Sequence, residues 1–482
     1  MIFSNAHSNL RFPVRLVGIA ALAVALASCG GGGGGSTSVS GSGSSGNTIA
    51  TPTTNAAQII VDSGPNAVGC TAAEQTNGCT NGSPIGSVNI AFVTVNVCLP
   101  GTATCQSIDH VMVDTGSSGL RVMASAMTSV LPGSFAQVQT NASGLFECAQ
   151  FADGFTWGSV RTADIGIAGE TASSANFQVI GDTAAGTAPT ACSNTGAQLD
   201  DNFAFGANGV LGVGLFIDDC FTGGTCPTGL GLNFYFNCSV ISSSSSIAST
   251  CAESTADTTQ QVANPVAFFG TDSNGVIVEL PGVTSGGAAT ATGSLVFGIN
   301  TESNNKTAKQ AVYLVNPGSS TQSPFLAGDF FSTLTNTGGY GGVGAAWPNS
   351  FFDSGSNGLF LPGTTIPCDN TYGWFIPGST LSLTANIQGE DVNDAAVGAV
   401  GTLSFSIANA NTLFNSGNTA FDNLGGPVST CSSGTGSGTQ SGDNGGIDWG
   451  LPIFYGRNIF VGMETNTITI NGTGYSAPLW SF

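Results

Sequence analysis

Two stretches of the sequence repeat one pattern: residues 111–120 read VMVDTGSSGL, and residues 351–359 read FFDSGSNGL. Each stretch begins with apolar residues, continues with Asp, a hydroxyl residue, Gly and Ser, and ends in Gly-Leu. The apolar residues predict the end of a buried strand, and the Gly permits a sharp turn directly after it. We therefore expect Asp114 and Asp353 at matching positions in two similar halves of the chain.

The repeated pattern predicts a pair of cooperating carboxyl groups. If the two loops meet across a pseudo-twofold axis, the carboxyls lie about 3 Å apart and share one proton. The ionised partner can then take a proton from water, while the protonated partner donates to the carbonyl that the water attacks. The residues expected to hold these carboxyls are Thr115, Gly116, Ser117, Ser354, Gly355 and Ser356.

A third Asp-Ser-Gly occurs at residues 62–64, but its surroundings differ. Pro65 follows it, and the Gly-Leu that closes the other two copies is missing. Because Asp, Ser and Gly are common turn residues, we interpret this copy as a turn.

The composition predicts an all-β protein with two lobes. The 482 residues exceed one ordinary core, 41% are hydrophobic, and 71 are Gly. Short apolar runs alternate with clusters of Gly, Asn, Ser and Thr, as in strands joined by turns. We expect an N-terminal lobe at residues 85–252 and a C-terminal lobe at 253–482. Residues 47–84 precede them as either a pro-segment or an added strand.

The N-terminus has the features of a lipoprotein signal. Residues 1–28 contain Arg11 and Arg15, followed by an apolar run too short to span a bilayer comfortably. The run ends in Leu-Ala-Ser-Cys, which resembles the lipobox of bacterial lipoproteins. Cys29 would then be lipidated, and residues 29–46 would form a Gly/Ser tether. Ordinary signal-peptide cleavage after Ala27 is the alternative. The expected location is the cell envelope, anchored in the outer membrane.

The charge balance limits the possible partners. Without residues 1–28 the chain keeps 28 acidic and five basic residues, a net charge of −23. This balance excludes a basic nucleic-acid groove, and an anionic membrane surface would repel the domain. We expect a monomer whose partners are a peptide or protein substrate and, through the lipid anchor, the membrane.

The cysteines predict disulfide bonds. Twelve remain after Cys29, an even number in an oxidising compartment. The absence of a CxxC pair or a Cys/His cluster argues against zinc, and no metal or cofactor is expected. The pairs suggested by nearness in the sequence are Cys70–Cys79, Cys98–Cys105, Cys220–Cys226 and Cys238–Cys251. Cys148–Cys192 and Cys368–Cys431 would complete the set, although the sequence alone does not fix the connectivity.

Several segments together resemble the pepsin family of aspartic peptidases. Residues 114–122 (DTGSSGLRV) resemble its first active-site motif. Residues 208–214 and 450–457 are similar to the elements that complete the two active-site loops, and residues 151–158 resemble the flap hairpin. The chain also resembles a bacterial family of Gly-rich exported lipoproteins of unassigned function. The pepsin resemblance implies a two-lobed fold and an endopeptidase.

The same resemblance identifies residues around the substrate groove. They are Phe151, Asp153, Gly154 and Trp157 of the flap, with Arg121 beside them. Phe151 replaces the usual flap Tyr, and Arg121 replaces the Trp that supports it. Arg121 is expected either to stack on Phe151 or Trp157, as cations do on aromatic rings, or to pair with a nearby acid.

Two functions remain open at this point. The first is an aspartic endopeptidase that uses water activated by Asp114 and Asp353. The second is a catalytically weak or inactive envelope protein of the same fold, with a binding or structural role. The altered flap and the Arg121 substitution favour the second function. Asp448 is a further departure from the family pattern, in the apolar pair before the second-lobe Gly. His110 is expected to be a partnered, partly buried side chain and not a catalytic base.

Overall fold

The computed structural model describes residues 47–140, 143–220, 224–228, 234–238, 251–308, 310–315, 328–369, 372–391, 393, 395–428, 431 and 446–482. The predicted signal peptide, Cys29 and the tether lie outside these residues. The described part is mainly β, as predicted, and none of its helices is long and apolar enough to cross a membrane. The α-helices are α1 (Ala72–Thr76), α2 (Thr190–Ser193), α3 (Asn202–Phe205) and α4 (Ala410–Phe414).

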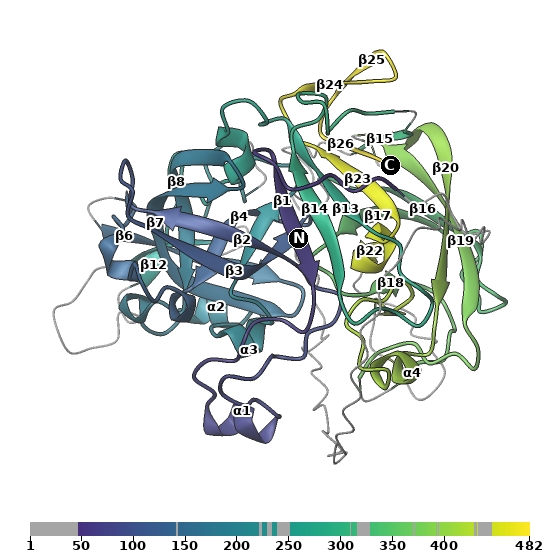
Figure 1. Cartoon of the computed structure of the whole chain (residues 1–482), viewed down its shortest axis with the longest axis horizontal. Helices are drawn as coiled ribbons and strands as arrows, with labels where there is room; N and C mark the ends of the chain where they lie inside the picture. Colours follow the sequence, from purple (N-terminus) through teal and green to yellow (C-terminus); the bar gives the residue numbers. More distant parts are fainter. Residues whose placement is uncertain are drawn as a thin grey trace, which may run out of the picture.

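Strands β2 to β12 form the first half of the molecule, drawn in blue and teal in Figure 1. β2 (Ala91–Cys98) and β3 (Cys105–Asp114) pair as an antiparallel hairpin. The other strands of the first half are β4 (Ser118–Met123), β5 (Gln139–Thr140), β6 (Ser143–Phe151), β7 (Gly154–Ile167), β8 (Glu170–Ile180), β9 (Ala197–Gln198), β10 (Gly209–Val213), β11 (Tyr235–Cys238) and β12 (Cys251–Glu253).

Strands β16 to β22 form the second half, a separate seven-stranded sheet. Its order is β20-β19-β16-β17-β22-β18-β21, so strands far apart in the sequence lie side by side. The strands are β16 (Phe330–Asn336), β17 (Ala346–Asp353), β18 (Leu359–Leu361), β19 (Leu381–Glu390), β20 (Ala396–Ile407), β21 (Gly425–Pro427) and β22 (Asp448–Gly450).

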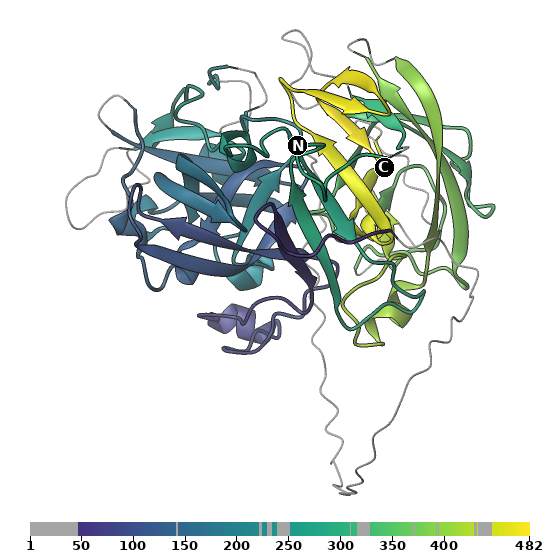
Figure 2. The same cartoon turned by 45° about the horizontal axis from the view of Figure 1, so that its top comes forward.

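A run of paired strands lies between the two halves (Figure 2). It continues from β2 through β1, β14, β13, β23 and β26 to β15, and the hairpin β24–β25 is separate. The bounds are β1 (Ala56–Val61), β13 (Gly275–Leu280), β14 (Ala291–Phe297), β15 (Val312–Leu314), β23 (Arg457–Gly462), β24 (Thr467–Ile470), β25 (Thr473–Ser476) and β26 (Leu479–Ser481).

Strand β1 decides how residues 47–84 belong to the fold. All six of its residues pair with β14, from Ala56 opposite Val296 to Val61 opposite Ala291, and its end also pairs with β2. Residues 56–61 therefore form a strand of the large sheet, with partners on both sides. β1 is an interior strand that links the first half to the strands between the halves.

The predicted boundary after residue 252 falls inside a segment that still contacts the first half. β12 pairs with β11 across that position. Further along, Val262 N donates to Tyr235 Oη at 2.8 Å, and Asn264 Nδ2 donates to the Gly214 carbonyl at 3.2 Å. The contacts of the first half thus extend to residue 264.

All six predicted disulfides are present. Four of them link cysteines 6 to 13 residues apart, and the other two span 44 and 63 residues. They are Cys70–Cys79, Cys98–Cys105, Cys148–Cys192, Cys220–Cys226, Cys238–Cys251 and Cys368–Cys431.

The third Asp-Ser-Gly forms a turn, as its sequence context predicts. Gly64 N donates to Asp62 Oδ1 at 2.9 Å, which closes the turn. Asp62 Oδ2 also lies 3.3 Å from His110 Nε2, and the His110 ring packs edge-on against Phe92. The hydrogen bond with Asp62 raises the pKa of His110. His110 is therefore the partnered, partly buried side chain that was expected.

Adjacent isoleucines on β1 test its place in the sheet. Ile59 is 0% exposed and Ile60 is 36% exposed, because successive side chains point to opposite faces. Ile59→Ala is expected to lower the free energy of unfolding by about 2–5 kcal/mol. Ile60→Ala is expected to change it by less than about 0.5 kcal/mol. Urea unfolding of both variants measures the difference, and equal losses would contradict an interior β1.

Candidate active site

Asp114 and Asp353 occupy equivalent positions in the two halves. Each is the last residue of its strand, β3 or β17. Asp114 lies opposite Gly212 on the parallel strand β10, and Asp353 lies opposite Gly450 on the parallel strand β22. β10 and β22 then pair antiparallel with β4 and β18, the strands that follow each Asp loop. The fold therefore holds both aspartates with the same local topology.

The two opposing glycines let the backbones pass close behind each loop. A Cβ atom at Gly212 would lie 2.6 Å from Ser118 N, and one at Gly450 would lie 2.1 Å from the Gly358 carbonyl oxygen. Both distances are shorter than non-bonded contact allows. These positions require Gly because of the close approach, which agrees with the Gly in both sequence motifs.

Four hydrogen bonds join the two loops to one another. Thr115 Oγ1 donates to the Phe352 carbonyl at 2.9 Å and accepts from Ser354 N at 2.9 Å. In the reciprocal pair, Ser354 Oγ donates to the Val113 carbonyl at 2.7 Å and accepts from Thr115 N at 3.1 Å. Thr115 and Ser354 are both buried. Each hydroxyl thus satisfies buried backbone groups of the opposite half.

Each carboxyl accepts one backbone N–H and one serine hydroxyl from its own loop. These donors fix the orientation of the carboxyl groups, as the sequence predicted for the residues after each Asp. The donors to Asp114 are Gly116 N at 2.8 Å and Ser117 Oγ, and the donors to Asp353 are Gly355 N at 2.8 Å and Ser356 Oγ at 2.8 Å.

The two carboxyls lie against each other and against the glycines of both loops. A Cβ atom at Gly355 would lie 2.7 Å from Asp114 Oδ1 and 3.1 Å from Asp353 Oδ1, and one at Gly116 would lie 2.9 Å from Asp353 Cγ. Burial raises the pKa of Asp353 well above its usual range, and the charges of Asp114 and Asp448 raise it further. Both carboxyls cannot easily ionise together, so the pair retains a proton.

A third carboxyl, Asp448, belongs to this site and was not among the predicted residues. Its Oδ2 lies 2.7 Å from Ser356 Oγ, which also contacts Asp353. Burial raises the pKa of Asp448 to about 8, and the charge of Asp114 acts in the same direction. The signal in the sequence was an acidic residue in a place where the first half has the apolar Val210. Among the described residues, no three His, Cys, Asp or Glu side chains are arranged to hold a metal ion.

The predicted flap residues form a hairpin in the first half. β6 and β7 pair up to Phe151 opposite Gly154, so Asp153 lies in the two-residue turn. The Phe151 ring packs against Phe205 of α3, with centroids 5.8 Å apart. A Cβ atom at Gly154 would lie 2.2 Å from the Ala197 carbonyl oxygen of β9. None of these contacts joins the hairpin to either catalytic candidate.

Trp157 is a core residue at the base of this hairpin. It is 1% exposed, and its Nε1 donates to the Ala185 carbonyl at 3.2 Å. Its ring stacks on Phe146 and meets Phe236 edge-on. The ring contacts of Trp157 are therefore aromatic, and they do not involve Arg121.

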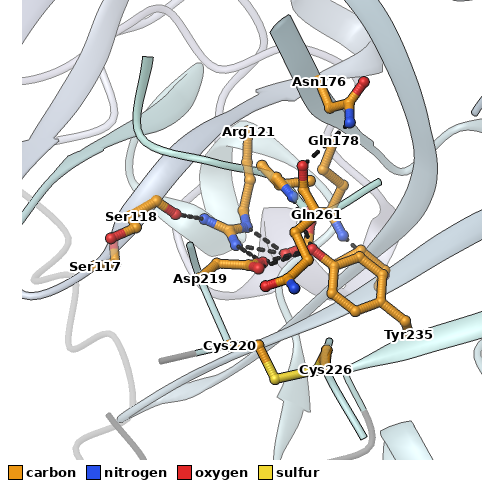
Figure 3. Close-up of polar contacts among 12 residues, drawn as sticks. Ser117, Ser118, Arg121, Asn176, Gln178, Asp219, Cys220, Cys226, Tyr235 and Gln261 are labelled. Carbon is orange, nitrogen blue, oxygen red and sulfur yellow. Dashed lines mark hydrogen bonds and ion pairs between the residues drawn. A yellow bond between two sulfur atoms is a disulfide. The ribbon is translucent and has the colours of Figure 1, made fainter. Parts of the chain in front are cut away.

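Arg121 pairs with buried acids, so the predicted stacking on Phe151 or Trp157 is wrong and the ion-pair alternative is right. Its Nη2 contacts Glu147 Oε1 and lies 3.0 Å from Asp219 Oδ2, while Nη1 donates to the Ser118 carbonyl at 2.8 Å. Tyr235 Oη donates to Asp219 at 2.8 Å (Figure 3). All three charged residues are buried. Planar guanidinium suits such a two-acid site, and Arg121 thereby fixes the chain just after the first Asp loop.

The two acids around Arg121, Asp219 and Glu147, differ in their surroundings. Burial raises the pKa of Asp219 well above its usual range, and the neighbouring Glu147 raises it further. Glu147 Oε2 is buried and has no hydrogen-bond partner among the described residues. One guanidinium therefore faces two buried carboxyls, which makes its presence important for the stability of the first half.

The bonds between the loops predict a specific loss of stability. Thr115→Val removes the hydroxyl but keeps the shape, and it leaves the Phe352 carbonyl and Ser354 N without their buried partner. We expect the free energy of unfolding to fall by roughly 2–4 kcal/mol. Thr115→Ser keeps the hydroxyl and should lose much less. Urea unfolding compares the two, and equal losses would show that the methyl group matters more than the hydrogen bonds.

The charge cluster around Arg121 predicts a second loss. Arg121→Gln leaves Glu147 and Asp219 buried without a cation, which is expected to cost about 3–5 kcal/mol of unfolding free energy. Lys306→Gln is the control, because it removes a positive charge from an exposed position. Thermal and urea unfolding measure both variants. A loss below about 1 kcal/mol for Arg121→Gln would show that the acids are neutral without it.

Comparison with known protein families identifies the family of the chain. No curated protein matches the chain. The match to a protein family covers residues 65–482, which includes both Asp loops, the charge cluster and all strands except β1. The chain therefore belongs to the family described as "Protein of unknown function (DUF3443)".

Proposed function

We propose that the chain is an aspartic endopeptidase with a two-lobed, pepsin-like fold. The observation that carries this proposal is the placement of Asp114 and Asp353. Equivalent loops from the two halves hold their carboxyls together through the reciprocal bonds of Thr115 and Ser354. Two coupled, partly buried carboxyls with one proton between them are suited to activating water.

In this reaction the ionised carboxyl takes a proton from a water molecule, which attacks the carbonyl of the scissile peptide bond. The protonated carboxyl donates to the carbonyl oxygen, where negative charge develops. Ser117 and Ser356 keep the two carboxyls oriented, so their groups need little rearrangement during the reaction. The dyad then returns a proton to the leaving amine, and no covalent intermediate forms.

The topology supports the two-lobed interpretation. The first half supplies β3, β4 and β10 around Asp114, and the second half supplies β17, β18 and β22 around Asp353. The strands between the halves, with β1 among them, would be the platform that joins the lobes. An extended peptide would bind across the ends of β3 and β17.

We further propose that the protein acts in the bacterial cell envelope, attached through a lipid on Cys29. Six disulfides support an oxidising compartment. The signal-like residues 1–28 and the Leu-Ala-Ser-Cys sequence support export and lipidation. The acidic surface fits a protein that contacts the membrane only through its anchor.

The second candidate function is binding without efficient cleavage, and one observation favours it. Phe151 at the hairpin tip has no hydroxyl and packs on Phe205 in the first half. A hairpin without that hydroxyl has one hydrogen-bonding group fewer for a substrate held over the carboxyls. Under this interpretation the Asp loops would serve mainly to join the two halves.

Cleavage of a denatured protein mixture from pH 3 to 9 separates the two candidates. We expect activity that falls at low pH, where both carboxyls are protonated, and at high pH, where both are ionised. Because the pKa of Asp353 is raised, the high-pH fall should lie above the usual carboxyl range. Asp114→Asn and Asp353→Asn should each reduce kcat/KM by at least about 10³-fold.

Asp62→Asn is the matched control for these two variants. It changes the Asp of the third Asp-Ser-Gly, which forms a turn beside His110. Its activity should stay within about threefold of the unmodified protein, as expected for a substitution outside the site. No cleavage by the folded, unmodified protein at any pH would favour the binding function.

A further inference from the structure

One serine hydroxyl in the site contacts two different carboxyl groups. Ser356 Oγ lies 2.8 Å from Asp353 Oδ2 and 2.7 Å from Asp448 Oδ2. A hydroxyl group has a single proton, so it can donate to only one of these oxygens. The other contact at this distance requires a proton on the carboxyl itself. One of the two aspartates must therefore donate to Ser356.

Three observations identify Asp448 as that donor. Its Oδ1 is buried and has no hydrogen-bond partner among the described residues, an arrangement much costlier for a charged carboxylate than for a neutral acid. In Asp353, by contrast, the oxygen that Ser356 does not contact accepts a hydrogen bond from Gly355 N at 2.8 Å. Burial also raises the pKa of Asp448 to about 8.

The position of Asp448 is fixed by its strand and not by chance packing. Its two neighbours in the chain are both bound to the second half. Ile447 N donates to Ser350 Oγ at 3.0 Å, and Trp449 Nε1 donates to Ser332 Oγ at 3.0 Å. Asp448 also pairs with Phe351 in the parallel register that places Gly450 opposite Asp353.

The first half lacks this arrangement at the equivalent place. Two residues before Gly212, the position that corresponds to Asp448 is the buried, apolar Val210. Ser117 Oγ contacts Asp114 Oδ2. The two Asp loops are thus alike in their other described hydrogen bonds but differ in the proton donor behind the serine.

We propose that Asp448 is a positioning residue for the Asp114–Asp353 pair, which keeps its proton and donates it to Ser356. Ser356 then directs its own proton to Asp353 Oδ2. The chain of hydrogen bonds favours the ionised form of Asp353, because it strengthens a donor to that carboxyl. It thereby opposes burial and the charge of Asp114, both of which raise the pKa of Asp353. This inference rests on the proposed peptidase function.

The titratable groups that face Asp448 set its pH dependence. They are Asp114 and Asp353, both of which disfavour a further negative charge. Asp448 has a raised pKa, so it is neutral below about pH 8 and ionises above it. The ionised form would compete for the Ser356 proton and repel the charge on the pair. The chain of hydrogen bonds from Asp448 through Ser356 to Asp353 is therefore complete below about pH 8 and is lost above it.

Carbon-13 NMR of the full-length protein tests the protonation state without any need for activity. Aspartate labelled at the side-chain carboxyl carbon gives one signal per residue, and Asp448→Asn identifies the signal of Asp448 by its loss. We expect this carboxyl to remain in its neutral form from pH 4 to 7 and to titrate near 8. A signal that titrates below about pH 5 would overturn the proposal, whether or not the protein cleaves peptides.

The pH dependence of kcat/KM tests the effect on the pair. Asp448→Val places in the second half the residue that the first half has, and it removes the donor to Ser356. Its low-pH limb should move up by about 0.5–1 pH unit, because the ionised dyad is less well stabilised. Asp448→Asn, whose amide is a permanent donor, should restore the limb of the unmodified protein.

These kinetic outcomes separate positioning from a purely structural role. If Asp448 served only packing, Val and Asn would change stability while leaving the low-pH limb in place. An equal shift in both variants would show that the charge of Asp448 matters, and it would also overturn the proposal. Ser356→Ala provides the last check, since in its background Asp448→Val should produce no additional shift.

Discussion

Everything at the centre of this molecule depends on the reciprocal hydrogen bonds between Thr115 and Ser354. Each side chain closes onto the backbone of the opposite half, just before the Asp of that half. Two carboxyl groups this close resist being brought together, because burial and mutual repulsion both act against their charges. The bonds between the loops oppose that repulsion with groups that stay neutral at every pH. The two loops are therefore held together by bonds to the backbone of both halves, and not by an attraction between the two carboxyls.

The sequence predicted features that depend on local pattern. The two Asp motifs, the turn at Asp62 and four of the six disulfides could be recognised because their residues are close together or repeat one spacing. Cys148–Cys192 and Cys368–Cys431 span 44 and 63 residues, so their pairing does not follow from spacing. The partners of Arg121 could not, since Glu147 and Asp219 lie 26 and 98 residues away in the chain. β1 posed a similar problem, because its six residues AAQIIV show an apolar segment but not its partners, β2 and β14, which come later in the chain. In the sequence, Asp448 is only a polar residue in an otherwise apolar motif. Its contact with Ser356 joins residues 92 positions apart, so the sequence does not show it.

Two of the protein's few positive charges lie buried in its first half. Only seven Lys and Arg residues occur in 482, and two of the arginines are buried against acids. Arg121 contacts Glu147 and Asp219, and Arg161 Nη2 lies 2.9 Å from Asp182 Oδ2. A guanidinium offers several donors in a fixed plane, so one side chain can join strands and loops at once. The surface is left with an excess of acids, while the scarce cations act as internal connectors in the first half.

The first described residues of the chain are bound at the strands between the halves. Asn47 Nδ2 donates to the carbonyls of Leu280 and Arg457 at 2.9 Å, and Ala50 N donates to Glu279 Oε2 at 2.6 Å. Any mechanical tension on the chain before residue 47 therefore reaches these contacts first and β1 next. Beyond these contacts, the pull meets the hydrogen bonds that pair all six residues of β1 with β14 and the end of β1 with β2. Tension on the N-terminus is thus resisted first by strands in the interior of the large sheet, and not by a strand at its edge.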